Sequence, residues 1–162
     1  MSAGPESAAK QLERVLGFFS RAEAKSAFAS GLITAMLTVL VADLDKISAL
    51  AWWQAPCVVF LFFACRIYYE VYWTQAPNLA GGTGSLIYFR EISKLREEQY
   101  VQGFTALDEE ALTKQILEQV WRNSVILAKK FDSVDRAYGY IKYALPFWVA
   151  TLVLLHFQHV AK

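Results

Sequence analysis

The sequence predicts an all-α membrane protein. We expect an N-terminal two-helix transmembrane hairpin, then a cytoplasmic helical pair, then a C-terminal transmembrane helix. Three observations predict it: 56% of the 162 residues are hydrophobic and only 19% are charged, three apolar runs approach bilayer length, and the basic residues lie mostly outside those runs. The mean hydropathy of +0.27 and the formal net charge of +1 exclude a disordered chain and a strongly basic nucleic-acid binder.

The three apolar runs are the candidate membrane spans, because a helix needs about 17 to 25 apolar residues to cross a bilayer. The first run is followed by Asp43 and not by a small-residue cleavage site, so we expect a retained span and no cleavable signal peptide. A soluble helical bundle is the alternative, but the runs lack the polar face of a soluble helix. The spans are expected at residues 26–42, about 49–69, and 143–160.

The distribution of Lys and Arg predicts the orientation, since cytoplasmic loops of membrane proteins carry an excess of both. Basic residues gather before the first span and between the second and third, whereas the connection 43–48 contains only Lys46. Both basic regions are therefore expected in the cytoplasm and the C-terminus outside. The predicted segments are a cytoplasmic N-terminal segment (1–25), a transmembrane hairpin (26–73), a cytoplasmic helical region (74–142), and a third transmembrane helix with a short external tail (143–162).

Two charges lie near the cytoplasmic end of the second span. Arg66 and Glu70 are four residues apart, so they share a helix face and can pair or extend toward the headgroups. A role in lining a pore is the alternative. Before the first span, Glu23 and Lys25 do not share a face, and we expect one to meet the headgroups and the other to meet the cytoplasmic helix.

The region between the second and third spans begins with a Gly-rich loop at residues 81–85. A helix is predicted over residues 86–102, with Gly103 as its terminator. Thr105 and Asp108 then form the pattern of a capping box, which predicts the start of another helix.

That next helix, predicted over residues 108–138, has the clearest amphipathic pattern in the chain. Only Gly139 and Pro146 separate it from the third span. We therefore expect a movement of the cytoplasmic helix to tilt the membrane helix directly.

Polar side chains at the edge of its apolar face are the sharpest candidates for a binding site. Gln119, Asn123 and Lys130 lie there at helical spacing. They predict either a polar seam between helices or a set of ligand contacts. The Gly-rich loop, which includes Gly84 and Ser85, is likewise either a link or an anion site made by backbone N–H groups.

Catalytic and metal-binding patterns are absent from the sequence. No nucleophile, base and orienting group occur together, so we do not expect an enzyme. His156 and His159 have no carboxylate or Cys partner nearby, which favours a place at the membrane interface over metal binding. Cys57 and Cys65 are interpreted as small apolar side chains.

Three stretches of the chain carry a family resemblance. QVWRNSVILAKKF (119–131), SLIYFREISKLREEQYVQGF (85–104) and RAEAKSAFASG (21–31) resemble the transmembrane effector family of the bacterial Pycsar antiphage systems. Glu23 stands where Asp is usual in that family. The central match is carried by Gln119, Asn123, Ser124, Ile126, Lys130 and Phe131.

The resemblance implies a multi-pass effector of the bacterial inner membrane. Such an effector senses cyclic CMP or cyclic UMP, made by a partner nucleotide cyclase during phage infection, and then impairs the membrane and halts the host cell. The cyclic nucleotide is an activating ligand, and no cofactor is expected. Its phosphate would suit Lys130, Arg122 or the Gly-rich loop, and Asn123 or Gln119 could read a base edge.

We also expect a homo-oligomer within the lipid bilayer, because a protomer of three spans is too thin to enclose a conducting path. The alternative function is a structural membrane subunit that binds a protein partner through the 108–138 helix and binds no nucleotide. A third interpretation, an enzyme that processes the nucleotide, would require turnover of that ligand.

Overall fold

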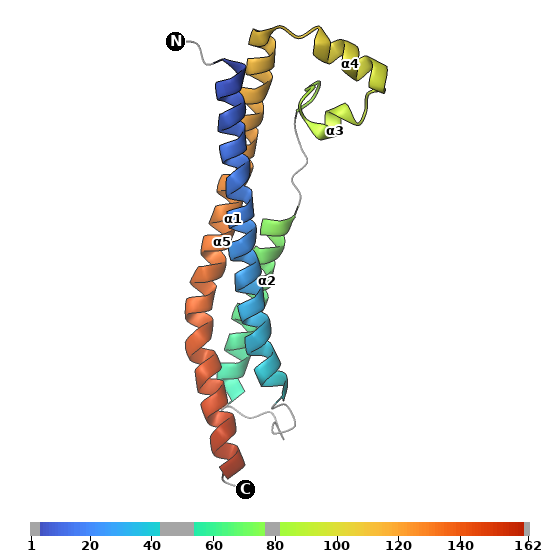
Figure 1. The fold of residues 1–162 in the computed structure, drawn as a ribbon. Helices are drawn as coiled ribbons and strands as arrows, with labels where there is room; N and C mark the ends of the chain where they lie inside the picture. Colours follow the sequence, from blue (N-terminus) through green and yellow to red (C-terminus); the bar gives the residue numbers. More distant parts are fainter. Residues whose placement is uncertain (1–3, 43–53, 77–81, 161–162) are drawn as a thin grey trace. The chain divides into compact units, whose positions relative to one another are not determined.

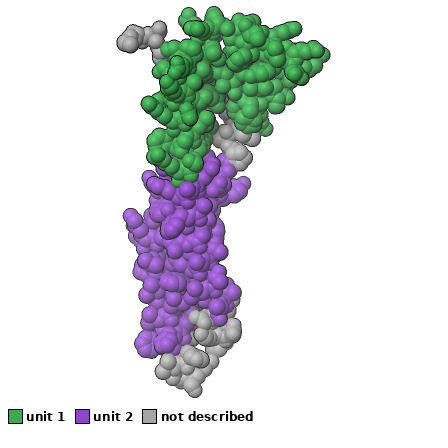
Figure 2. All heavy atoms as spheres, viewed as in Figure 1, with its two compact units in different colours: residues 1–21, 77–129 green, residues 22–76, 130–162 purple. Residues whose placement is uncertain are grey.

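A computed structural model of the chain describes residues 4–42, 54–76 and 82–160. All regular structure in these residues is helical, which confirms the predicted all-α class (Figure 1). The helices form two compact units, unit 1 with residues 1–21 and 77–129 and unit 2 with residues 22–76 and 130–162 (Figure 2). The elements are α1 (Pro5–Ala42), α2 (Ala55–Gln75), α3 (Phe89–Ile92), α4 (Glu97–Thr105) and α5 (Glu109–Val160).

Three helices, α1, α2 and α5, are long and apolar enough to cross a membrane. Their apolar parts meet in the core of unit 2, where Phe60 and Ile67 of α2 are fully buried beside Ile33 of α1. The indole N–H of Trp148 in α5 donates to the carbonyl oxygen of Met36 in α1 at 3.0 Å. The buried members of this core are Ile33, Met36, Leu40, Phe60, Ala64, Ile67, Ala137, Ala144 and Leu155.

Buried positions recur every seven residues in both long helices. A repeat of seven residues, with two buried positions in each repeat, keeps one line of side chains facing a partner helix. In α5 we call the buried and half-buried line Ile116, Asn123, Lys130, Ala137, Ala144 and Thr151 the α5 seam. In α1 the matching line is Ala8 and Val15 in unit 1, with Ala22, Ala29 and Met36 in unit 2.

The single helix predicted over residues 86–102 is wrong. The chain forms α3 and α4 instead, and residues 93–96 separate them. Arg96 has an extended backbone with ψ of 152°, and the side-chain oxygen of Gln99 accepts a hydrogen bond from the Arg96 N–H at 3.1 Å. Glu97 and Glu98 follow in the first turn of α4, where carboxylates favour a helix start.

The predicted cap residues also differ from the structure. Gly103 lies inside α4 and Thr105 is its last residue. Asp108 caps α5, because its side-chain oxygen accepts a hydrogen bond from the Ala111 N–H at 2.7 Å. A short polar side chain just before a helix commonly accepts such a bond.

The long helices are more continuous than the sequence pattern indicated. α1 begins at Pro5, so the predicted N-terminal segment and first span share one helix of 38 residues. α2 ends at Gln75, and residues 49–53 of the predicted second span lie outside the described residues. α5 has 52 residues and passes through Gly139 and Pro146 without interruption.

Candidate functional site

The Gly-rich loop of unit 1 is a fixed turn. Gly82 and Gly84 have φ of 80° and 75°, which favours glycine at both positions. The Ser85 N–H donates to the Gly82 carbonyl oxygen at 2.8 Å, and the Gly84 N–H donates to the Glu91 carboxylate at 3.1 Å. The buried Ser85 hydroxyl accepts hydrogen bonds from the N–H groups of Ile87 and Tyr88, just before α3, each at 3.3 Å. These donors are already engaged, so an anion at this loop needs charged side chains as well.

Glu91 holds the turn from the side of α3. Hydrogen bonds from the Lys94 ammonium and from the Gly84 N–H hold the pKa of the Glu91 carboxyl below its usual range. The carboxyl therefore stays ionised at neutral pH, and its contribution to the loop is lost only when the pH falls through that lowered pKa.

Gln115 attaches the loop to α5. Its side-chain oxygen accepts a hydrogen bond from the Leu86 N–H at 2.9 Å. Sequence reasoning missed this residue. Its position was a usable signal, because Gln115, Gln119 and Arg122 are spaced four and three residues apart and so share one face of α5.

Arg122 is the basic side chain that meets the loop. Its guanidinium lies against Gly82, where an added Cβ would stand 2.8 Å from Nη1 of Arg122 and 2.6 Å from the Tyr88 ring. Only glycine fits there. Nη2 of Arg122 donates to Glu118 at 3.0 Å, whereas Nη1 is buried and, within the described parts of the chain, has no hydrogen-bond partner.

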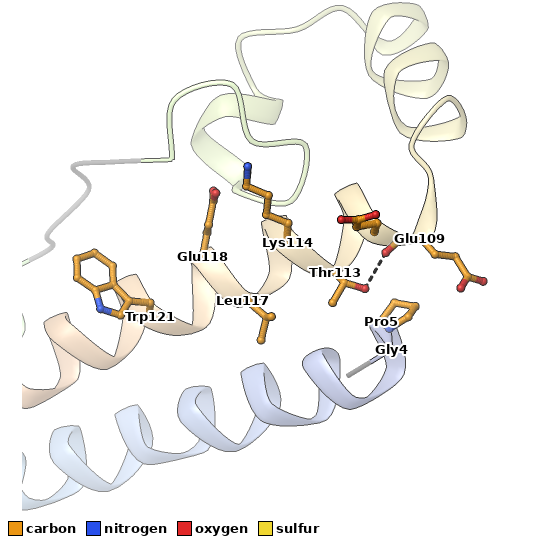
Figure 3. A pocket seen from close by; sticks show the side chains of 9 residues that line it. Gly4, Pro5, Glu109, Thr113, Lys114, Leu117, Glu118 and Trp121 are labelled. Atoms are coloured by element: carbon orange, nitrogen blue, oxygen red, sulfur yellow. Dashed lines mark hydrogen bonds between the residues drawn. The ribbon is translucent and has the colours of Figure 1, made fainter. Parts of the chain in front are cut away.

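Two hollows lie along α5 in unit 1. The smaller, of about 290 Å³, is lined by the loop residues 83–85 and by Ala111, Lys114, Gln115 and Glu118. The larger is a groove of about 930 Å³ between the starts of α1 and α5 (Figure 3). The two hollows share the side chains of Lys114 and Glu118. The groove is lined by Gly4, Pro5, Glu109, Glu110, Thr113, Lys114, Leu117, Glu118 and Trp121.

The remaining predicted ligand residues of unit 1 lie further along α5. Gln119 and Asn123 are half-buried, and Asn123 belongs to the α5 seam. Ser124 is exposed, and its hydroxyl donates to the Val120 carbonyl oxygen at 2.8 Å. The structure thus brings Arg122 to the loop that holds Gly84 and Ser85, and it places Ser124 on the exposed side of the helix.

Lys130 belongs to unit 2. Its ammonium donates a hydrogen bond to the carbonyl oxygen of Thr74, in the last turn of α2. The carbonyl groups at the end of a helix favour a cation. This contact ties α2 to α5 inside unit 2 and supports the seam interpretation of Lys130.

A charged cluster joins the same two helices. Glu70 is buried, with 3% of its surface exposed. It lies 3.6 Å from Arg66, as the sequence spacing predicted, and 3.0 Å from Arg136 of α5. Arg66 also donates to the Tyr140 hydroxyl at 3.1 Å. Each charge of the cluster therefore has a partner.

Lys25 and Glu23, which precede the first predicted span, have different surroundings. The Lys25 ammonium lies 5.6 Å from the centre of the Phe131 ring, a cation–π contact with α5 inside unit 2. Glu23 is exposed.

His156 is exposed, and the His159 side chain lies outside the described residues. In the described part of the chain, no three His, Cys, Asp or Glu side chains cluster as metal ligands.

These features define a class of protein: a helical chain with three helices able to span a membrane and a separate unit whose loop is fixed beside a basic side chain. The chain belongs to the Pycsar effector family, because the model of the Pycsar effector protein domain matches residues 7–156. The predicted resemblance is confirmed, and the protein is assigned to the transmembrane effectors of antiphage defence. No curated protein and no solved structure gives a significant match to the chain.

Proposed function

We propose that this protein is an effector of the bacterial inner membrane that binds a cyclic pyrimidine mononucleotide from a partner cyclase and then impairs the membrane, which arrests the host cell. The observation that carries the proposal is the family match across residues 7–156, which includes both the apolar helices and unit 1. Unit 1 offers a polar surface for a signal, and unit 2 offers helices that suit a bilayer.

Charge favours the loop side of α5 for the ligand. A cyclic mononucleotide carries one negative charge on its phosphate. Lys94, Lys114 and Arg122 stand near the loop against the carboxylates of Glu91 and Glu118, whereas three carboxylates and one ammonium line the groove on the other side. An anion is therefore favoured at the loop and opposed in the groove.

Within that site Arg122 is proposed to hold the phosphate, because an arginine can donate two parallel hydrogen bonds to it and Nη1 has no hydrogen-bond partner among the described residues. Gln119 is proposed to read the base edge, since its amide both donates and accepts. Asn123 remains a candidate for the same role, one turn further along α5.

The test is isothermal titration of the purified full chain with a panel of cyclic nucleotides. We expect binding of cyclic CMP or cyclic UMP in preference to cyclic AMP and cyclic GMP. Loss of a charge-assisted hydrogen bond costs about 1.5 to 3 kcal/mol, roughly ten- to a hundredfold in affinity, so Arg122→Ala should weaken binding by that factor. Arg90→Ala, an exposed arginine of α3, is the control.

A structural subunit without a nucleotide ligand would give no heat with any member of the panel. Ligand turnover during the titration, followed by chromatography of the nucleotide, would instead indicate an enzyme. Either result would overturn the proposal.

A further inference from the structure

An apolar stripe on the outer side of α5 in unit 1 is left uncovered. Trp121 is 68% exposed and Leu117 is 43% exposed. Ser124 and Ala128 continue the line with spacings of four, three and four residues, which is the spacing that a second packed helix requires. We call Leu117, Trp121, Ser124 and Ala128 the outer stripe. Charged residues flank it, among them Lys114, Glu118 and Lys129, so a lipid environment does not explain it.

We propose that the outer stripe docks the α1 helix of a second copy of this chain. The exposed side of α1 in unit 1 offers the matching features. Lys10, Arg14, Gly17 and Arg21 are all exposed and recur with spacings of four, three and four residues, so they form one face. We call these four residues the outer face of α1.

Gly17 provides the space for Trp121. A Cβ added at Gly17 would meet nothing within 4 Å in the chain itself, and an exposed glycine inside a helix lowers its stability relative to alanine. No contact within the described part of the same chain explains that cost. A large side chain from a neighbouring molecule fits over a glycine as a knob fits a hole.

Gly17 and Trp121 lie at corresponding positions along their helices. In unit 1 the starts of α1 and α5 line one groove and the helices run in the same direction (Figure 3). Gly17 is twelve residues after Pro5, and Trp121 is twelve residues after Glu109. A rise of 1.5 Å per residue places each about 18 Å along its helix. The same groove is lined by Pro5 and by α5 residues from Glu109 to Trp121, so copies inserted in the same direction in one membrane bring this part of α1 near this part of α5 in height.

Charge agrees as well. Arg14 lies three residues before Gly17 in α1, and Glu118 lies three residues before Trp121 in α5. A contact that sets Trp121 over Gly17 therefore brings Arg14 near Glu118. The outer face of α1 is basic, and the groove beside the outer stripe carries three carboxylates against one ammonium. Complementary charge fixes register between partners more than it adds affinity.

The contact is heterologous, because α5 of one copy meets α1 of the next. A contact of this kind repeats from copy to copy and closes a ring when the rotation allows it. The surface deepens the proposed function, in which several copies act together in one membrane. Its test uses no nucleotide, so the surface and the nucleotide proposal can fail separately.

Single-cysteine variants in native membranes test the contact, in a chain where Cys57 and Cys65 are replaced by alanine. Copies with Gly17→Cys and copies with Trp121→Cys carry different tags and are expressed together. The isolated membranes are then treated with copper phenanthroline and oxygen, which supply the oxidant that two thiols need to form a disulfide. We expect mixed disulfides between the two tags. Phe18→Cys with Trp121→Cys is the matched control, because Phe18 is exposed and lies about 100° round α1 from Gly17.

The second measurement is the mass of the purified protein in detergent by light scattering. Truncation of a buried interface tryptophan weakens association about thirtyfold, so Trp121→Ala should yield smaller species. Phe104→Ala, which alters an aromatic residue of α4 that is 40% exposed, should not. Mixed disulfides no more abundant than in the control, disulfides only between two Trp121→Cys copies, or an unchanged mass for Trp121→Ala would each overturn the proposal.

Discussion

Two alternative roles can be assigned to Lys130. The resemblance implies that its ammonium contacts the nucleotide phosphate, whereas the structure directs the ammonium to the Thr74 carbonyl oxygen. A lysine in a seam of seven-residue repeats fixes the register of the helices, at a cost in stability. Asn123, seven residues before Lys130, is another polar residue of the α5 seam. The two roles make opposite predictions for a single substitution.

We predict that Lys130→Ala lowers the melting temperature of the protein. The substitution removes a charged donor from a half-buried carbonyl, and such hydrogen bonds contribute about 1.5 to 3 kcal/mol. Differential scanning fluorimetry of the detergent-solubilised protein measures the change. Lys129→Ala removes an adjacent, exposed lysine and should have little effect. An unchanged melting temperature together with weaker nucleotide binding would assign Lys130 to the ligand.

Single residues also show the limits of sequence reasoning. The pairing of Arg66 with Glu70 follows from a spacing of four residues on a helix, and the structure has it. Arg136 is the third member of this charged cluster. It lies 66 residues after Glu70 in the sequence, so a local spacing pattern cannot predict the contact. Gln115 was missed for the same reason, because its hydrogen bond reaches a loop that is 29 residues away.

At the scale of elements, hydrophobic pattern predicted which segments are helical but not where they end. The three spans were found because apolar length is a strong signal. The split between α3 and α4 depends on the side chain of Gln99 and on the extended backbone of Arg96, neither of which alters the apolar pattern. Pro146 lies inside α5 although proline removes one backbone hydrogen bond, so tertiary packing of the seam outweighs that local cost.

Continuity of α5 predicts that the stiffness of this helix transmits the signal. A ligand shifts an equilibrium only by its differential affinity for the two states, so the change in unit 1 must reach the apolar part of α5. We predict that a Gly-Ser-Gly-Ser insertion after Gly139 leaves nucleotide affinity nearly unchanged and abolishes toxicity. Growth and membrane potential after cyclase induction, with titration of the purified variant, measure both.

The control for that insertion is four alanines at the same position. Four alanines continue the helix and rotate its following part by about 40°, whereas the Gly-Ser insertion has the same length but fixes no rotation. The two variants therefore match in inserted length and differ in stiffness. We expect the alanine variant to retain more toxicity than the flexible one. Full toxicity of the flexible variant, once shown to reach the membrane in normal amount, would contradict transmission through α5.

At the scale of the whole molecule, the number of spans and the distribution of charge determine the topology. Three helices are able to span a membrane, and an odd number of spans predicts that the two chain ends lie on opposite sides of it. Basic residues precede the first span and fill the segment between the second and third, and such regions remain in the cytoplasm. The C-terminus is then the end that we expect to cross, even though Lys162 lies in it.

We therefore predict that the N-terminus and residues 74–142 are cytoplasmic and that the C-terminus is periplasmic. A C-terminal alkaline phosphatase fusion should be active, because that enzyme folds only outside the cytoplasm, and a C-terminal green fluorescent protein should be dark. Fusions at the N-terminus should behave in the opposite way and serve as the control. An inactive C-terminal phosphatase with a bright C-terminal fluorescent protein would place that end inside.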